Sequence, residues 1–323
     1  MSDWYALELI ERSFEDVKQL LLPFDFKKML KMAVVVLFAG GSIGGMSNMS
    51  GTASDIAGQT GGQSGGSIAN SFMTGGMTGM ISAEAALPGI ILLVGLLVFG
   101  WVIAGSIMKF VFVQICSSNE VTVWDRFKNN FGNGIRLLGF QIIVALTGII
   151  LVGVPVGLLV FANVSNLAAG GLAILIAIPV ILAIALVNLL TGDFVIVDML
   201  DSDRGVTGSW KGIGEDLKGG WKQIAVYVLL KIGLMIGAGL IVGIASVMYI
   251  LASVLVFGIL GVIGYGLYSI IKLVGIVYFI LLGITGIVTL VVGMLFIRVP
   301  VDTFFRYYSI RVLEKLVDRE LIA

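Results

Sequence analysis

The chain has 323 residues, of which 58% are hydrophobic and 12% charged, and its 20 basic and 20 acidic side chains give a net charge of zero. Soluble domains carry about 25% charged residues, so this composition excludes an ordinary soluble protein, and the balanced charge gives no reason to expect nucleic acid as a partner. With no histidine and one cysteine, the chain lacks the commonest catalytic base and metal ligand, and we expect no cofactor.

Several apolar runs are long enough to cross a membrane, for which about 20 residues are needed. The sequence therefore predicts an all-α fold, a polytopic bundle of transmembrane helices that forms a single transmembrane domain over residues 1–323. The expected partners are membrane lipids, together with other membrane proteins or further copies of the chain.

Residues 1–28 are predicted to contain an amphipathic helix, over 3–22, that ends at Pro23. Its apolar positions recur every three or four residues at Trp4, Leu7, Ile10, Phe14, Val17 and Leu21. Its other face has more acidic than basic residues, which an anionic membrane surface would repel. Two interpretations stay open: docking on the protein's own basic loops or on a partner, and attachment to the membrane interface through the apolar face.

The first span is predicted over Met29–Met46, where flanking lysines lengthen a short apolar run. Residues 47–87 follow; they are rich in Gly and Ser and contain no Lys or Arg, so we expect a flexible external loop. Two Asn-x-Ser motifs, at Asn48 and Asn163, fall in predicted external loops and are candidate glycosylation sites.

Five further spans are expected along the rest of the chain. They cover about 88–108, 137–161, 167–190, a stretch from about 224, and 273–300. Residues 251–271 are apolar but glycine-containing, and they are interpreted either as a helix extension or as a re-entrant piece. Residues 298–323 form a basic C-terminal tail in this interpretation.

The distribution of Lys and Arg predicts the orientation. All but one of these residues lie within 12–31, 109–136, 204–231 and 298–319, and the exception is Lys272. Basic flanks stay in the cytoplasm, and two cytoplasmic flanks must enclose an even number of spans. The pattern therefore predicts six spans with both termini cytoplasmic, in the cell membrane.

A short motif of the form x-Val-x-Val-(Asp/Gln) ends three of the apolar runs. Its copies are Phe110–Gln114, Phe194–Asp198 and Arg298–Asp302. Trp124 and Trp210 follow the first two copies, each twelve residues before a basic residue. We infer an internal repeat in which three helical hairpins, each preceded by an interfacial helix, make up the domain.

Equivalent hairpins would place Gln114, Asp198 and Asp302 at matching depths, where the three side chains can converge. The candidates to neutralise the two aspartates are Arg298, Arg306 and Arg311. An unpaired buried charge is costly, so some neutralising partner is expected. The predicted polar collar has two interpretations: a hydrogen-bonded cap on the bundle, which we favour, or a binding site for an anionic lipid headgroup.

Two other patterns predict contacts between helices. Asn188, Thr191 and Asp193 lie at the end of a span, where buried polar side chains usually hydrogen-bond to another helix. Gly233 and Gly237 in the fifth span have the small-x3-small spacing that lets helix backbones approach each other.

The segments Gly192–Asp198, Val206–Trp210 and Val299–Tyr308 resemble those of an uncharacterised family of archaeal six-span membrane proteins. More distantly, they are similar to the membrane domain that precedes the catalytic part of some glycerophosphodiester phosphodiesterases. The resemblance covers most of the chain outside 47–87 and implies a membrane domain without assigned chemistry. Because the chain has no histidine for the usual acid–base groups of those enzymes, no hydrolase activity is implied.

Three classes of function remain open. A non-catalytic structural, lipid-organising or partner-organising membrane protein fits the sparse charge within the spans and is the first expectation. A small-solute transporter or channel fits the internal repeat, although no predicted span shows paired ionisable residues at mid-membrane. An enzyme acting on lipid headgroups would need the acidic cluster Asp198–Asp203, whose carboxylates suit Mg²⁺ or Ca²⁺ but are more typical of a solvated turn and helix cap.

Overall fold

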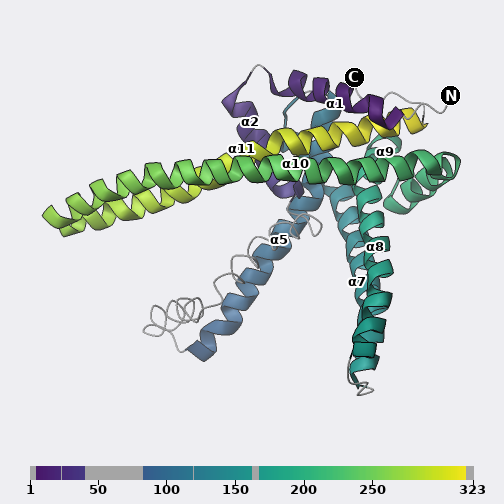
Figure 1. Cartoon of the computed structure of the whole chain (residues 1–323), viewed down its shortest axis with the longest axis horizontal. Coiled ribbons are helices and arrows are strands. Elements are labelled where there is room, and N and C mark those ends of the chain that lie inside the picture. Colours follow the sequence, from purple (N-terminus) through teal and green to yellow (C-terminus); the bar gives the residue numbers. More distant parts are fainter. Residues whose placement is uncertain (1–4, 23, 41–82, 119, 162–166, 318–323) are drawn as a thin grey trace. The chain divides into compact units, whose positions relative to one another are not determined.

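Figure 1 shows a computed structural model of the chain, which describes residues 5–22, 24–40, 83–118, 120–161 and 167–317. All regular structure in these ranges is helical. The helices are α1 (Tyr5–Leu21), α2 (Phe26–Gly40), α5 (Ala83–Ser118), α6 (Trp124–Asn129), α7 (Phe131–Phe161), α8 (Leu167–Leu190), the π-helix η1 (Thr191–Val195), α9 (Ile196–Ser202), α10 (Val206–Ile270) and α11 (Lys272–Val317). The prediction of an all-α fold is confirmed.

Five of the described helical stretches are long and apolar enough to cross a membrane, which identifies a membrane protein. They are Leu92–Ser118, Phe131–Pro155, Ala177–Ser202, Gly219–Ile270 and Lys272–Val317. Helix α2 covers the first part of the predicted span Met29–Met46, whose last residues lie outside the described ranges. The predicted loop 47–87 also lies outside them except for its end, where Ala83–Leu87 already belong to α5 because Ala, Glu and Leu are strong helix formers.

The chain divides into two compact units. One contains Met1–Leu37, Val111–Arg126 and Leu190–Ala323, and the other contains Phe38–Phe110 and Phe127–Leu189. Within the second unit α7 packs closely on α8, since a Cβ atom added at Gly148 would overlap the side chain of Ile184. The polar cluster described below lies wholly within the first unit.

In the first unit α10 and α11 run antiparallel and are joined by the single residue Ile271, whose backbone is extended. Two tyrosines tie the helices together: Tyr249 donates a 2.7 Å hydrogen bond to the carbonyl oxygen of Thr289, and Tyr278 donates one of 3.0 Å to that of Leu260. We call the part of this pair between Lys231 and Arg298 the arm. Residues 251–270 therefore form a helix extension and not a re-entrant piece.

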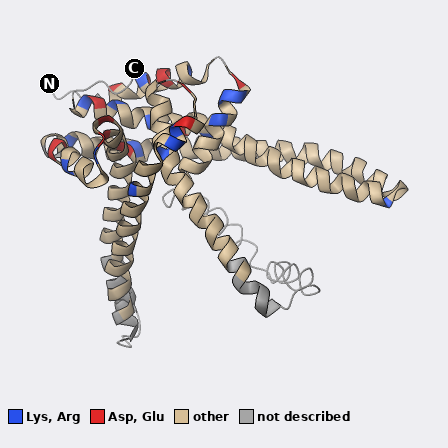
Figure 2. Cartoon of the chain, turned by 180° about the vertical axis from the view of Figure 1, so that it is seen from behind, with Lys and Arg blue, Asp and Glu red and all other residues tan. Residues whose placement is uncertain are grey.

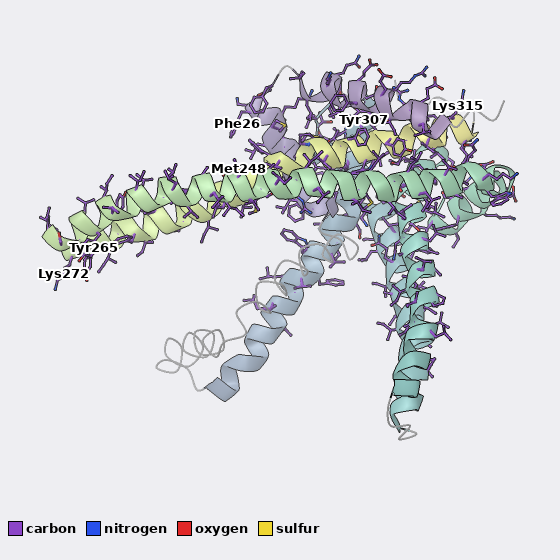
Figure 3. All side chains as sticks on the ribbon, viewed as in Figure 1. Phe26, Met248, Tyr265, Lys272, Tyr307 and Lys315 are labelled. Atoms are coloured by element: carbon purple, nitrogen blue, oxygen red, sulfur yellow. The ribbon has the colours of Figure 1, made fainter. Side chains whose placement is uncertain are left out.

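The arm has the length and surface of a membrane-spanning element. No Asp, Glu, Lys or Arg occurs in the sequence between Lys231 and Lys272, or between Lys272 and Arg298. At 1.5 Å per residue, Lys272 at the tip and Arg298 at the base are about 39 Å apart along α11, close to the ~40 Å of a bilayer with its headgroups. Figure 2 shows the ribbon of the arm without charged residues except at its tip, and Figure 3 labels Lys272 at this tip and shows the side chains that cover the arm.

The close approaches within the arm occur at other glycines than those predicted. Among the described residues nothing lies within 4 Å of a Cβ atom added at Gly233 or Gly237, so their small-x3-small spacing makes no helix contact there. At Gly275 and Gly293 such an atom would overlap Tyr268 and Tyr249, respectively. The antiparallel pairing of α10 and α11 around Ile271 determines which glycines face the partner helix. The spacing of glycines within one helix does not predict this.

Beyond the base of the arm, the first unit packs into a helical region that we call the basal core. It is formed by α1, the end of α5, η1, α9, the start of α10 and the end of α11. Its largest fully buried side chains include Leu20, Ile115, Phe194, Ile196, Met199, Tyr227, Tyr307 and Tyr308. Residues 298–317 of the predicted basic tail are thus helical, and their apolar positions, spaced by three and four residues, are buried.

Helix α1 docks on α11 within this core (Figure 1). The guanidinium group of Arg311 binds Asp16 through two hydrogen bonds, from Nε to Oδ2 at 2.9 Å and from Nη2 to Oδ1 at 3.0 Å. Its Nη1 donates a third hydrogen bond of 3.1 Å to Glu314. Of the two interpretations of the N-terminal helix, docking on the protein itself agrees with these contacts, although the basic partner Arg311 belongs to helix α11 and not to a loop.

Substitution of Arg311 by Met is expected to release α1 while leaving the arm intact. Solvent partly screens the ion pair between Arg311 and Asp16. We therefore expect its loss to lower the free energy that holds α1 in place by roughly 1–2 kcal/mol, and to make hydrogen exchange of the α1 amides about tenfold faster. Hydrogen exchange with mass spectrometry measures this effect. Lys315→Met, an exposed change on the same helix, is the control, and equal exchange in both variants would contradict the assigned role of Arg311.

Candidate functional site

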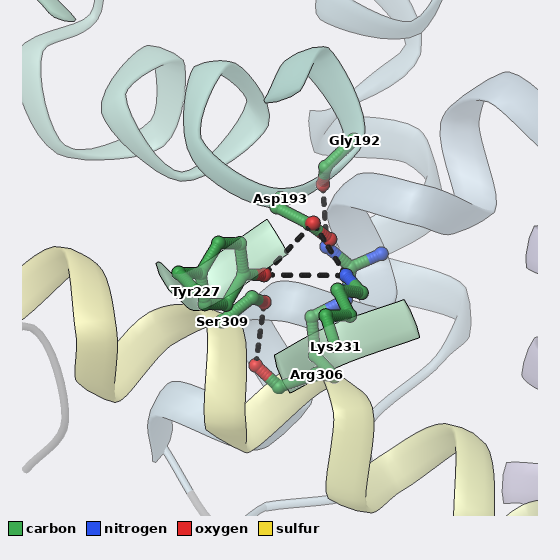
Figure 4. A network of polar contacts seen from close by, with 6 residues as sticks. All are labelled: Gly192, Asp193, Tyr227, Lys231, Arg306 and Ser309. Carbon is green, nitrogen blue, oxygen red and sulfur yellow. Dashed lines mark hydrogen bonds and ion pairs between the residues drawn. The ribbon is translucent and has the colours of Figure 1, made fainter. Parts of the chain in front are cut away.

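A buried polar cluster joins three elements of the basal core (Figure 4). Lys231 and Tyr227, one turn apart on α10, both donate to Oδ2 of Asp193 in η1, the tyrosine at 2.9 Å. Lys231 also donates a 3.2 Å hydrogen bond to the Tyr227 hydroxyl. All three residues are buried, so the lysine and the aspartate neutralise each other where water has little access.

The π-helix explains how Asp193 reaches this position. A π-helical turn contains one more residue than an α-helical turn and disturbs the regular hydrogen-bond ladder. Arg306 of α11 uses the carbonyl oxygen of Gly192 in this turn, to which its Nη1 donates a 2.7 Å hydrogen bond. From Phe194 in the turn to Val197 in α9, all four residues are buried, as expected for a helix surrounded by protein.

Aromatic rings enclose the cluster on one side. The Tyr227 ring lies 5.1 Å from that of Phe194 and 5.4 Å from that of Tyr308, measured between centroids. The Arg306 guanidinium lies 5.4 Å from the centre of the Phe112 ring, a cation–π distance. These rings lower the local dielectric constant and therefore strengthen the attraction between Lys231 and Asp193.

Two chemical roles fit this arrangement. A carboxylate, an ammonium and a phenol in direct contact can hold a proton at a defined place, as in proton relays. The same contacts can also serve as a structural lock between η1, α10 and α11. In either role the pair is costly to break, because the remaining partner would be a buried and unpaired charge.

The structure distributes the residues of the predicted collar over different contacts. Asp198 accepts a 3.2 Å hydrogen bond from Ser202 on its own helix. Asp302 lies one turn from both Arg298 and Arg306 on α11, but it forms no ion pair with either in the described ranges, so their neutralising role stays a prediction. The third arginine, Arg311, binds Asp16 and Glu314 instead. Gln114 is half-buried at the end of the first motif copy, and the convergence of the three motif ends stays a prediction.

The acidic residues between 193 and 203 are also divided. Asp193 enters the buried cluster, whereas Asp201 and Asp203 are exposed. Asp203 has a φ of 49° and occupies the left-handed cap position after α9, which agrees with the interpretation as a helix cap. In the described ranges no three metal-ligating side chains come together. The candidate glycosylation sites Asn48 and Asn163 lie outside these ranges.

Lys231 and Tyr227 were not among the residues singled out from the sequence. In the prediction of orientation, Lys231 is one of the basic residues that flank the fifth span. A usable signal does exist, because Lys231 follows Tyr227 by four residues within an otherwise apolar run, so both lie on one helix face. The expectation that Asp193 hydrogen-bonds to another helix is confirmed.

Comparison with curated proteins and with solved structures finds no match. A family model matches residues 4–321, which is nearly the whole chain, and it therefore includes the polar cluster, the arm and α1. The chain belongs to a family described as "Family of unknown function (DUF7544)".

Proposed function

We propose that the protein is a non-catalytic membrane protein that organises lipids or a protein partner at one face of the membrane. The observation that carries this proposal is the division of its charges. Asp193 and Lys231 are buried and neutralise each other, whereas Lys27, Lys31 and Arg298 are exposed and form no ion pair in the described ranges. The buried charges stabilise the basal core, and the exposed basic side chains remain available to bind lipids or a protein partner.

The finer organisation belongs to the same proposal. We infer six spans in three repeated hairpins, with α2 as the start of the first span and both termini in the cytoplasm of a cell. The distribution of Lys and Arg supports this orientation, and the uncharged arm between Lys272 and Arg298 supports one of the hairpins. Resemblance to archaeal six-span proteins and to the membrane domain of glycerophosphodiester phosphodiesterases supports a membrane domain only, with no hydrolytic activity.

Purification in a lipid-retaining polymer, followed by mass spectrometry, tests the proposal. We expect the retained material to be enriched in one lipid class, or in one protein partner, relative to the membrane from which it came. A lipid composition equal to that of the surrounding membrane, with no partner in stable proportion, would overturn the proposed function.

The buried pair Asp193–Lys231 favours a proton-coupled transporter as the second candidate. Ionisable residues that pair between apolar helices commonly mark ion or proton pathways. Proteoliposomes that contain a pH-sensitive dye would reveal proton flux, and Asp193→Asn together with Lys231→Met would abolish it. The lipid-headgroup enzyme, the third candidate, would use Asp198–Asp203, and the exposure of Asp201 and Asp203 is compatible with access from water.

Cysteine labelling on intact cells tests the orientation. In a Cys116→Ser background, Lys272→Cys at the tip of the arm is expected to react with a membrane-impermeant thiol reagent, because the tip is exposed and lies outside in the six-span topology. Lys315→Cys and Ser202→Cys are expected to stay unlabelled until the cells are permeabilised. Labelling of either residue from outside would exclude the proposed orientation.

A further inference from the structure

The exposed face of α2 combines apolar and cationic side chains in a single stripe. Phe26, Leu30 and Val34 are exposed and recur every four residues, which places them on one side of the helix. Lys27 and Lys31 are also exposed and repeat the same spacing one residue later. The buried side chains of α2 occupy the other side and include Met29, Met32, Ala33, Val35 and Val36.

The start of α2 is held beside the base of the arm. The Phe26 ring packs edge-on against that of Phe296 in α11, with 5.6 Å between their centroids. Asp25 caps the helix, since its Oδ1 accepts a 2.9 Å hydrogen bond from the Lys27 backbone N–H. The preceding residue, Phe24, is the most exposed of these aromatic side chains at 63%. Two segments distant in sequence thus meet where the arm ends.

The arm defines the depth of this meeting point in a membrane. Phe296 follows Lys272 by 24 residues of α11, or about 36 Å, which slightly exceeds the ~30 Å of the hydrocarbon core. With Lys272 at one membrane surface, Phe296 and Phe26 therefore lie where hydrocarbon gives way to headgroups on the other side. Aromatic side chains are enriched at this depth.

The charges at this level are mostly positive. Lys27, Lys31 and Arg298 are exposed, and none forms an ion pair in the described part of the chain. Two acids lie nearby: Asp25, which is engaged as the cap of α2, and Asp302, which lies one turn from Arg298 on α11. Lysines at a membrane surface attract the phosphate groups of anionic lipids, and the apolar residues beside them can enter the upper acyl region.

We propose that the exposed stripe of α2, together with Phe24 and Arg298, binds the headgroups of anionic phospholipids. Lys27 and Lys31 contact the phosphates, and the exposed apolar residues of the stripe lie among the upper acyl chains. This inference deepens the proposed function and rests on it, because it names the lipid class and the surface through which a lipid-organising protein would act.

Titration of the full-length protein in detergent with dioleoyl phosphatidylglycerol or dioleoyl phosphatidylcholine tests the inference, with bound lipids counted by native mass spectrometry. The wild type is expected to prefer phosphatidylglycerol. Lys27→Gln with Lys31→Gln is expected to lower the apparent affinity for that lipid by roughly ten- to thirtyfold, because each lysine contributes a favourable charge contact. The affinity for phosphatidylcholine should change little.

Two further variants separate charge from folding. Lys27→Arg with Lys31→Arg is expected to retain the preference. Lys211→Gln with Lys315→Gln also removes two exposed lysines but should behave as the wild type, since Lys315 lies about 25 Å along α11 from Arg298, beyond the ~10 Å screening length. An equal loss in this control would overturn the site.

The remaining outcomes discriminate between the proposals. A wild-type preference for phosphatidylglycerol that persists in Lys27→Gln with Lys31→Gln would overturn the site and leave the proposed lipid-organising function standing. Competition by inorganic phosphate at the lipid concentration would show a free-anion site and overturn the assignment to a membrane lipid. A wild type without any lipid preference would remove both the site and the lipid-organising form of the proposed function.

Discussion

Lys231→Met is expected to lower the free energy of unfolding by roughly 3–5 kcal/mol, because it leaves the Asp193 carboxylate buried without its counter-charge. Asp193 would keep the hydrogen bond from Tyr227 but lose the ammonium group that neutralises it. Thermal unfolding in detergent, followed by circular dichroism, measures the effect. Loss of folded protein during purification would be consistent with the upper end of this range.

The double change Asp193→Asn with Lys231→Met is the matched control. It removes both charges together, keeps an oxygen to accept the Tyr227 hydrogen bond, and is expected to recover most of the lost stability. A double variant as unstable as Lys231→Met alone would show that packing around Lys231, and not the unpaired charge, determines the loss. Tyr227→Phe is expected to cost only about 1 kcal/mol, the usual net value of one hydrogen bond.

Gly275→Ala is expected to destabilise the arm by about 1–3 kcal/mol, the cost of forcing extra volume into a packed position. The added Cβ atom would overlap the backbone of Tyr268, which cannot rotate away as a side chain can. Relief requires α10 and α11 to separate near Ile271, where a single residue connects them. A lower midpoint of thermal unfolding is the measured result.

Gly283→Ala on the same helix is the control, because nothing lies within 4 Å of its added Cβ atom. We expect no loss there, and a small gain from the higher helix propensity of alanine. Equal destabilisation by both substitutions would argue that the loss reflects glycine in general and not the close approach at Gly275.

The limits of several helices were the most predictable feature from sequence. The span expected over 167–190 agrees with α8, and the N-terminal helix expected over 3–22 agrees with α1. Apolar runs of this length have few alternatives, since a lipid-facing backbone must satisfy its own hydrogen bonds. The interfacial helix expected before the fifth span is not separate from that span, because Val206–Ile270 is one helix with a kink at Gly220.

The polar cluster was only half predictable. A buried aspartate at the end of a span needs a donor on another helix, so the hydrogen bonding of Asp193 follows from chemistry alone. Its partners depend on the π-helical turn at Thr191–Val195, because this turn changes the direction in which every later residue of the helix points. No pattern in the sequence predicts the turn. For the same reason the arginine that contacts this turn, Arg306, could be assigned to a collar but not to the Gly192 carbonyl.

The ion pair between Asp16 and Arg311 spans 295 residues of sequence and therefore sets an order of events during synthesis. A ribosome adding about 5–20 residues per second needs on the order of 15–60 s to pass from one partner to the other. Throughout that time the buried face of α1, with Leu20 and Val17, has no α11 to cover it. Any factor that shields nascent apolar helices would have to cover α1 until α11 is complete.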